Sequence, residues 1–203
     1  MIIVLSIQAE LCNNLRTQGF FMTTNHIDEN IISRFKKFFS NGQFDDIIDA
    51  DINHAATKAF IYPTDDVYLT QRQFSALVSI LAQNEQLFAM EMNWRTKLGF
   101  FDKDNVYFTL ATKTYTEYLT TSFSTISLLF SDSFDWVILC NEDRYSGHAV
   151  MLGQRVRVER FKSAYGLCES DTKEYVDYCE KTYINGCGNL KENLRIIYDL
   201  DYS

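Results

Sequence analysis

The sequence predicts an α+β fold in which four to five helices pack with a mostly antiparallel sheet. Three observations lead to this class: helical periodicity behind capping residues, short alternating strand patterns between the helices, and two apolar runs joined by turn residues. The chain has 203 residues, 46% of them hydrophobic and only one a proline, so it is long enough to bury a full core. No linker-like stretch and no fixed-period repeat divides it. We therefore expect one globular domain over residues 1–203.

Helices are predicted where apolar residues recur every three or four positions behind a residue that can cap the first turn. Thr70 and Gln73 form a capping box in sequence, a hydroxyl and an amide three residues apart. The same three-residue spacing occurs between Thr114 and Glu117 and between Asp171 and Glu174. The predicted helices cover residues 28–40, 71–83, 115–130 and 172–183, with a further N-terminal helix over 7–15.

Strands are predicted from alternating or continuous apolar runs. Residues 136–140 are apolar throughout and have polar neighbours, which is typical of a central strand buried on both faces. Turn residues follow and lead to a second apolar run, so residues 135–152 are predicted to form a β-hairpin. Further strands are predicted over residues 106–110, 154–161 and 194–200.

The charge of the chain narrows the class of partner. There are 19 basic and 27 acidic residues, a net charge of -8. Such a molecule repels nucleic acid and anionic membranes and attracts a basic protein. No apolar run is long enough to cross a bilayer, and the first apolar stretch is too short for a signal peptide. We expect a cytoplasmic protein.

The densest negative charge lies between residues 44 and 66, where six aspartates stand against Lys58 for a local charge of -5. This segment is either a solvated surface that keeps the protein soluble or a face that binds a basic partner. Tyr62 or Phe44 would then be the apolar anchor beside the charges. The candidate partner-binding residues are Asp45, Asp46, Asp49, Asp51, Tyr62, Asp65 and Asp66.

No metal or cofactor site is expected. Residues 49–53 resemble the opening of an EF-hand calcium loop, but the sixth loop position is His54 instead of glycine. The twelfth position is Phe60, where a calcium loop needs a bidentate glutamate. The cysteines and histidines are too scattered for a structural zinc site.

Catalytic motifs are equally sparse. The five cysteines are dispersed and odd in number, so we expect reduced thiols, with Cys140 and Cys179 in the core. Cys187 lies in an Asn-Gly-Cys-Gly-Asn loop and, together with His148, leaves open a thiol-dependent hydrolase or transferase. Neither a nucleophile elbow nor a glycine-rich phosphate loop is present.

One basic stripe lies within the strand predicted over residues 154–161, where Arg155 and Arg157 would share a face. Arg160 and Lys162 extend it. Three interpretations stay open: salt bridges within the protein, contact with a partner, and contact with nucleic acid. The last would need a larger basic footprint than four residues.

The hairpin segment DWVILCNEDRYSGHAVMLG, residues 135–153 of a small acidic α+β chain rich in aromatic residues, resembles the bacterial immunity proteins of contact-dependent and other polymorphic toxin systems. The resemblance implies a cytoplasmic protein that binds a cognate toxin domain, for example a nuclease. The bound protein would block the toxin's active site or its access to substrate. The resemblance carries over no binding residues. Besides this function and the thiol enzyme, a regulatory or adaptor protein that self-associates through aromatic residues is the remaining alternative.

Overall fold

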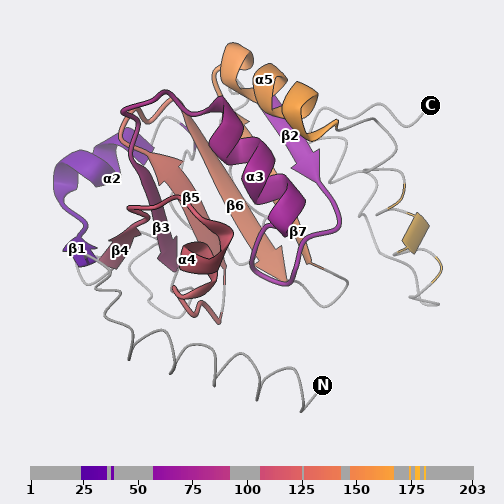
Figure 1. The fold of residues 1–203 in the computed structure, drawn as a ribbon, viewed down its shortest axis with the longest axis horizontal. Coiled ribbons are helices and arrows are strands. Elements are labelled where there is room, and N and C mark those ends of the chain that lie inside the picture. The colour runs from indigo at the N-terminus through magenta and orange to yellow at the C-terminus, as the bar shows by residue number, and fades with distance from the viewer. Residues whose placement is uncertain are drawn as a thin grey trace.

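The computed structural model describes residues 24–35, 38, 57–91, 106–124, 126–142, 147–166, 174, 177–178 and 181. Figure 1 shows how the helices and strands formed by these residues are arranged. In chain order the elements are β1 (Thr24–His26), α2 (Glu29–Phe35), β2 (Thr57–Ile61), α3 (Gln71–Ile80), β3 (Leu87–Glu91), β4 (Val106–Thr109), α4 (Tyr115–Leu119), β5 (Ser127–Ser131), β6 (Trp136–Glu142), β7 (Gly147–Gly153) and α5 (Arg155–Tyr165).

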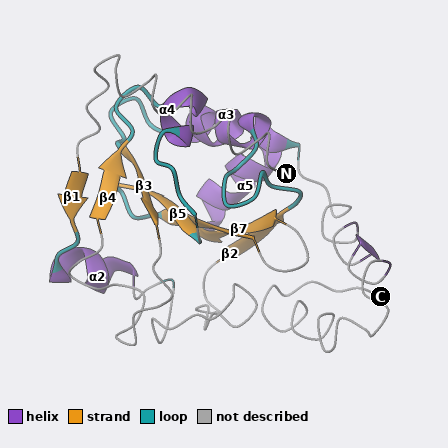
Figure 2. Cartoon of the chain, turned by 90° about the horizontal axis from the view of Figure 1, so that it is seen from below, coloured by secondary structure: helices purple, strands orange, loops and turns teal. Residues whose placement is uncertain are grey.

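The seven strands form one sheet in the order β1-β4-β3-β5-β6-β7-β2, and every neighbouring pair is antiparallel. Helices α3, α4 and α5 lie on one side of the sheet, whereas α2 lies on the other side near β1 (Figure 2). The predicted α+β class with an antiparallel sheet is therefore confirmed.

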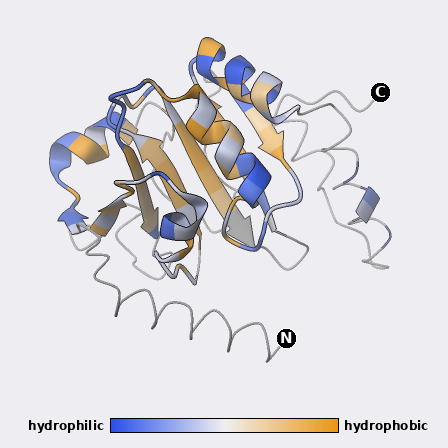
Figure 3. Ribbon diagram, in the orientation of Figure 1, coloured by the Kyte–Doolittle hydropathy of each residue, from blue (hydrophilic) through white to orange (hydrophobic). Residues whose placement is uncertain are grey.

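Strand β6 is central, as its continuous apolar sequence predicts. It pairs with β5 on one side and with β7 on the other, and residues 136–140 are all buried. The predicted hairpin is confirmed in the β6–β7 register, in which Trp136 lies opposite Gly153 and Glu142 opposite Gly147. Figure 3 shows most of β6 in the hydrophobic colour.

The main core lies between the sheet and its three helices. Strands β6 and β7 contribute alternate residues to it, which places Cys140 at 0% exposure and confirms that this thiol belongs to the core. From the helices, Phe74 stacks on Tyr118 with ring centroids 4.8 Å apart, and Val158 and Phe161 of α5 are fully buried. On the opposite side of the sheet, the buried Phe35 of α2 meets Phe130 of β5 edge to face at 5.0 Å.

Two helices follow their sequence signals. Helix α3 begins behind Thr70, and the predicted capping box is present, with the Gln73 amide nitrogen donating to Thr70 Oγ1 and the Thr70 amide nitrogen donating to Gln73 Oε1. Helix α2 begins after Asp28, whose side chain accepts from the Ile31 amide at 2.8 Å. Of the predicted strand at 106–110, the structure has β4 over its first four residues.

The strand predicted over residues 154–161 is wrong, because these residues form most of α5. The segment alternates at its start, but Val158, Phe161 and Tyr165 recur at the helical spacing and cover the sheet together. Gly166 ends the helix in the left-handed conformation at φ 74°, where glycine is favoured.

The single helix predicted over residues 115–130 is also wrong beyond its first turns. The cap at Thr114 is real, since its hydroxyl accepts from the Glu117 amide, but α4 ends at Leu119. Thr120 and Thr121 hydrogen-bond back to carbonyls of α4, and Ser122 takes a positive φ of 55°. The aliphatic run that follows becomes β5.

Strands β1, β2 and β3 were not predicted. Of the helix predicted over residues 172–183, Glu174, Asp177, Tyr178 and Lys181 are described, and all four are helical. The predicted helix at 7–15 and the predicted strand at 194–200 lie outside the described residues.

Candidate functional site

Two of the candidate partner-binding residues, Asp65 and Asp66, lie in the connection between β2 and α3, within a segment that we call the acidic loop (residues 64–68). The loop closes through paired backbone hydrogen bonds between Asp65 and Tyr68, at 2.8 and 3.0 Å. Thr64 Oγ1 donates to the Asp66 carbonyl at 2.9 Å, and the Thr64 amide donates to the carbonyl of Gly147 at the start of β7. The loop is therefore anchored to the sheet.

Two features give this loop a fixed shape. Asp66 has a positive φ of 53°, a conformation that aspartate tolerates better than most residues. A Cβ atom at Gly147 would lie 2.8 Å from the Asp66 carbonyl oxygen and 2.8 Å from Thr64 Oγ1, so the close approach of β7 to the loop requires glycine. The side chains of Asp65 and Asp66 are exposed.

A tyrosine stands beside these carboxylates. Tyr115 of α4 hydrogen-bonds through its hydroxyl to the Asp65 side chain. Burial, together with the negative charge of Asp65, raises the pKa of Tyr115 to about 12. The hydroxyl is thus a donor at physiological pH, and it orients one carboxylate of the loop.

The remaining predicted site residues are distributed differently. Tyr62 is only 8% exposed, follows the last residue of β2 and lies against the ring of Tyr178, with centroids 6.5 Å apart. Little of its side chain is available to a partner. Asp45, Asp46, Asp49 and Asp51, with Phe44 and the calcium-like segment 49–53, lie outside the described residues.

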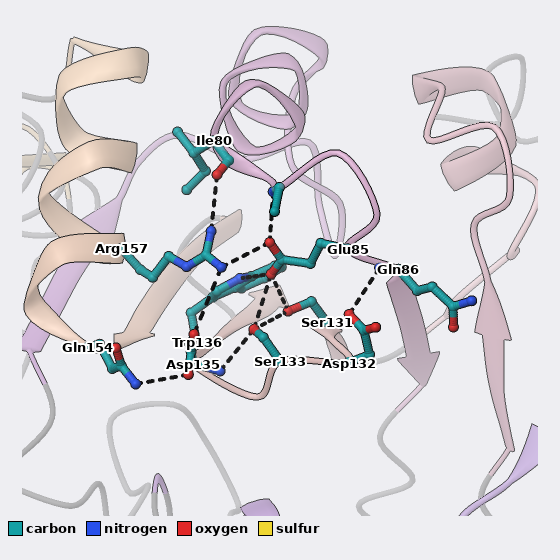
Figure 4. Close-up of polar contacts among 11 residues, drawn as sticks. Ile80, Glu85, Gln86, Ser131, Asp132, Ser133, Asp135, Trp136, Gln154 and Arg157 are labelled. Carbon is teal, nitrogen blue, oxygen red and sulfur yellow. Dashed lines mark hydrogen bonds and ion pairs between the residues drawn. The ribbon is translucent and has the colours of Figure 1, made fainter.

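The densest polar cluster in the described part of the chain was not predicted. We call it the Glu85 cluster; it joins Glu85, Ser131, Ser133, Trp136 and Arg157 (Figure 4). Glu85 is 5% exposed and comes just before β3. Its Oε1 accepts hydrogen bonds from Ser131 Oγ at 2.6 Å, Ser133 Oγ at 3.1 Å and Trp136 Nε1 at 3.3 Å. These three donors belong to the end of β5, the following turn and the start of β6, so Oε1 binds Glu85 to that part of the sheet.

The second oxygen of the same carboxylate binds an arginine. Glu85 Oε2 lies 3.0 Å from Arg157 Nη2 and accepts from the Ala82 amide at 2.9 Å. Arg157 also donates to the carbonyl of Ile80 at the end of α3 and lies 3.8 Å from Asp135. This geometry confirms for Arg157 the interpretation as an internal salt bridge, although the residue lies on a helix.

The chemistry of the Glu85 cluster is structural. Burial by itself raises the pKa of Glu85, but hydrogen bonds from Ser131, the Ala82 amide and Trp136, with the positive charge of Arg157, outweigh it and leave the pKa below its ordinary value. A carboxylate held ionised by five donors is a weak general base. It is suited to holding α5, β3 and the β5–β6 turn together.

A second buried carboxylate serves a single loop. Glu117 of α4 is 5% exposed and accepts from the amides of Ala111, Thr112 and Lys113 at 2.8 to 2.9 Å, and from the Thr112 hydroxyl. We call this arrangement the Glu117 cage. It satisfies the backbone donors that precede α4.

The thiol alternative receives no support from Cys140. Burial raises the pKa of this thiol to about 12, so it is protonated and inert. His148 of β7 is likewise fully buried and stacks on Phe60 at 5.5 Å. Cys187, the candidate nucleophile, lies outside the described residues.

The described residues contain neither a metal-binding cluster nor a membrane-spanning helix. No group of three or more His, Cys, Asp or Glu side chains in that part of the chain is arranged to hold a metal ion. Within the described segments no helix has the length and apolar character needed to cross a bilayer.

Comparison with known proteins finds no match: no family model, no curated protein sequence and no solved structure is similar to this chain.

Proposed function

We propose that this chain is an immunity protein that acts in the cytoplasm, binding a cognate toxin domain and blocking its active site or substrate access. The observation that carries the proposal is the acidic loop, where exposed Asp65 and Asp66 project from a backbone that is fixed by hydrogen bonds within the loop and by one to Gly147 of β7. A loop with a fixed shape loses little conformational entropy on binding.

The charge of the chain supports the same proposal. At a net charge of -8, the molecule attracts a basic surface such as the cleft of a nuclease, and two carboxylates on a defined loop can take the positions of phosphates there. The buried carboxylates support it in another way. Glu85 and Glu117 are engaged in internal hydrogen bonds, so their chemistry serves the fold.

The first experiment is affinity purification of the tagged full-length protein from its own host, with washes at low and then high salt and mass spectrometry of the bound proteins. The proposal expects one stoichiometric partner with toxic activity, which survives high salt because a packed interface accompanies the charges. Adding this protein at equal concentration must then abolish the partner's activity. A partner that stays fully active when bound would contradict the proposal.

The acidic loop is tested with the purified partner. The double variant Asp65→Asn with Asp66→Asn removes two charges and keeps a residue type that accepts the positive φ of position 66. We expect the association rate constant to fall by about 10-fold at low salt, and less at high salt, as for steering by charge. The matched control is Asp28→Asn with Glu29→Gln on α2, where asparagine preserves the helix cap. Equal effects of the two double variants would remove the loop from the interface.

A further inference from the structure

The pair of helices α3 and α5 carries a charge opposite to that of the chain as a whole. Together they contain five basic residues and one acidic residue, a net charge of +4. Since the whole chain carries -8, the remaining residues carry -12. The two helices lie side by side over the same face of the sheet (Figures 1 and 2).

The basic residues of α5 divide into two kinds. Arg157 is held by Glu85, and Lys162 lies 3.4 Å from Glu159 on the helix surface. Arg155 and Arg160 are exposed, and neither has an ion pair with any described residue. The interpretation as internal salt bridges therefore holds for Arg157 and Lys162 but leaves two arginines facing solvent.

An apolar residue accompanies these two arginines. Val156 is 69% exposed, and the four-residue spacing places it on the same face of α5 as Arg160. Arg155 lies at the edge of this face, and the exposed Glu159, which pairs with Lys162, lies between Arg155 and Val156 around the helix. Ser163 and Ala164, farther along the helix, are also exposed and are small enough to leave this face open. Exposed arginine next to apolar surface is the composition favoured in protein interfaces.

We propose that the outward face of α5, formed by Arg155, Val156 and Arg160, is a docking surface for an acidic segment of a partner protein. Each guanidinium presents a planar fork of donors that matches a carboxylate, and Val156 supplies an apolar contact between them. The proposal concerns a surface distinct from the acidic loop and does not depend on the proposed function.

Nucleic acid and membrane fit this face less well. Double-stranded nucleic acid is bound by a broad basic footprint, whereas here two free arginines stand in a chain of net charge -8. An interfacial membrane helix needs a wide apolar face, but the apolar side of α5 is buried against the sheet through Val158 and Phe161.

The test measures binding of the full-length protein to a fluorescein-labelled glutamate-rich peptide by fluorescence anisotropy at low and moderate salt. For Arg155→Gln with Arg160→Gln we expect a Kd about 10-fold or more above that of the wild type, as two charge-assisted pairs are lost. Val156→Ser should weaken binding by about 3-fold through the loss of the apolar contact. Circular dichroism verifies that each variant is folded.

The matched control is Arg34→Gln with Lys181→Gln, which removes the same charge from exposed positions on other helical segments. Its Kd should stay within about 2-fold of the wild-type value if binding is local to α5. A wild type that does not bind the peptide, or a control that loses as much affinity as the α5 variant, would overturn the proposal. A DNA duplex or phosphatidylserine vesicles bound as tightly through the same arginines would overturn the assignment to an acidic protein.

Discussion

Two glutamates that are equally buried differ in how far along the chain their hydrogen-bond partners lie. Glu85 and Glu117 are both 5% exposed, and both accept several hydrogen bonds. The partners of the Glu117 side chain lie within six residues of it, in the loop before α4. Glu85 binds Ser131, Trp136 and Arg157, which lie 46, 51 and 72 residues away.

The difference teaches that equal burial does not mean equal structural importance. The Glu117 cage shapes one loop, and water can replace part of it because Ala111 and Thr112 are exposed. The Glu85 cluster connects the end of α3, the turn between β5 and β6, and α5. Loss of the Glu85 cluster should therefore destabilise the whole fold.

The largest expected effect is that of Glu85→Ala. Removing the carboxylate leaves Arg157 without its closest ion partner and the Trp136 ring nitrogen without its acceptor in a buried site, so we expect the free energy of unfolding to fall by about 3–5 kcal/mol. Urea unfolding followed by circular dichroism measures it. The control Glu29→Ala, on the exposed first turn of α2, should stay within about 0.5 kcal/mol of the wild type. A loss no larger than that of the control would show that the cluster does not hold these elements together.

Glu117→Ala should cost less, about 1–3 kcal/mol, because three backbone amides lose an acceptor at a site near solvent. Hydrogen exchange should speed up at residues 111–113 and stay unchanged in β6. Thr116→Ala, an exposed change on the same helix, is the matched control. Faster exchange in the central strands would mean that this cage also supports the whole sheet.

The same contrast explains what the sequence could predict. The Thr70 and Thr114 caps depend on residues three apart, and the β6–β7 hairpin joins two strands that are consecutive in the chain; all three were predicted. The Glu85 cluster joins residues that only the sheet brings together, and a lone glutamate after α3 carries no signal for it. Contacts between distant residues also determine the structure of α5. The alternation at residues 155–158 favours a strand, but Val158 and Phe161 pack in the core against the sheet only as part of a helix.

The candidate site follows this division in part. Asp65 and Asp66 were predicted from local charge density, and the structure shows that both are exposed. Tyrosine is a common anchor residue in interfaces, but Tyr62 directly follows the buried end of β2 and is itself buried. Sequence composition alone does not distinguish these two outcomes, because both depend on the path that the chain takes after β2.

Replacing Thr70 by alanine tests a local contact that lacks a buried charge. The hydroxyl caps α3, so we expect a loss of about 1 kcal/mol in the free energy of unfolding. Thr70→Ser keeps the hydroxyl and should retain most of the wild-type stability. A loss from Thr70→Ala as large as that from Glu117→Ala would mean that the charge in the Glu117 cage adds little.

The smallest expected effect is a change in the pH dependence of stability in acid. It is measured with Glu85→Gln, which removes the charge of Glu85 and keeps the size of the side chain. Because the folded-state pKa of Glu85 lies below the ordinary value of 4.5, its ionised form stabilises the fold above that pH. This contribution is lost as the pH falls through the folded-state pKa. Glu85→Gln lacks it at every pH, so its unfolding free energy should decline less steeply than that of the wild type below about pH 5.

Ser131→Ala sharpens this last prediction. The Ser131 hydroxyl is the foremost of the groups that lower the pKa of Glu85, so without it the folded-state pKa moves back toward the ordinary value. The acid decline of Ser131→Ala should then lie between those of the wild type and Glu85→Gln, measured by urea unfolding from pH 3 to 7. Parallel curves for all three proteins would mean that hydrogen bonding, and not the charge paired with Arg157, accounts for what Glu85 contributes.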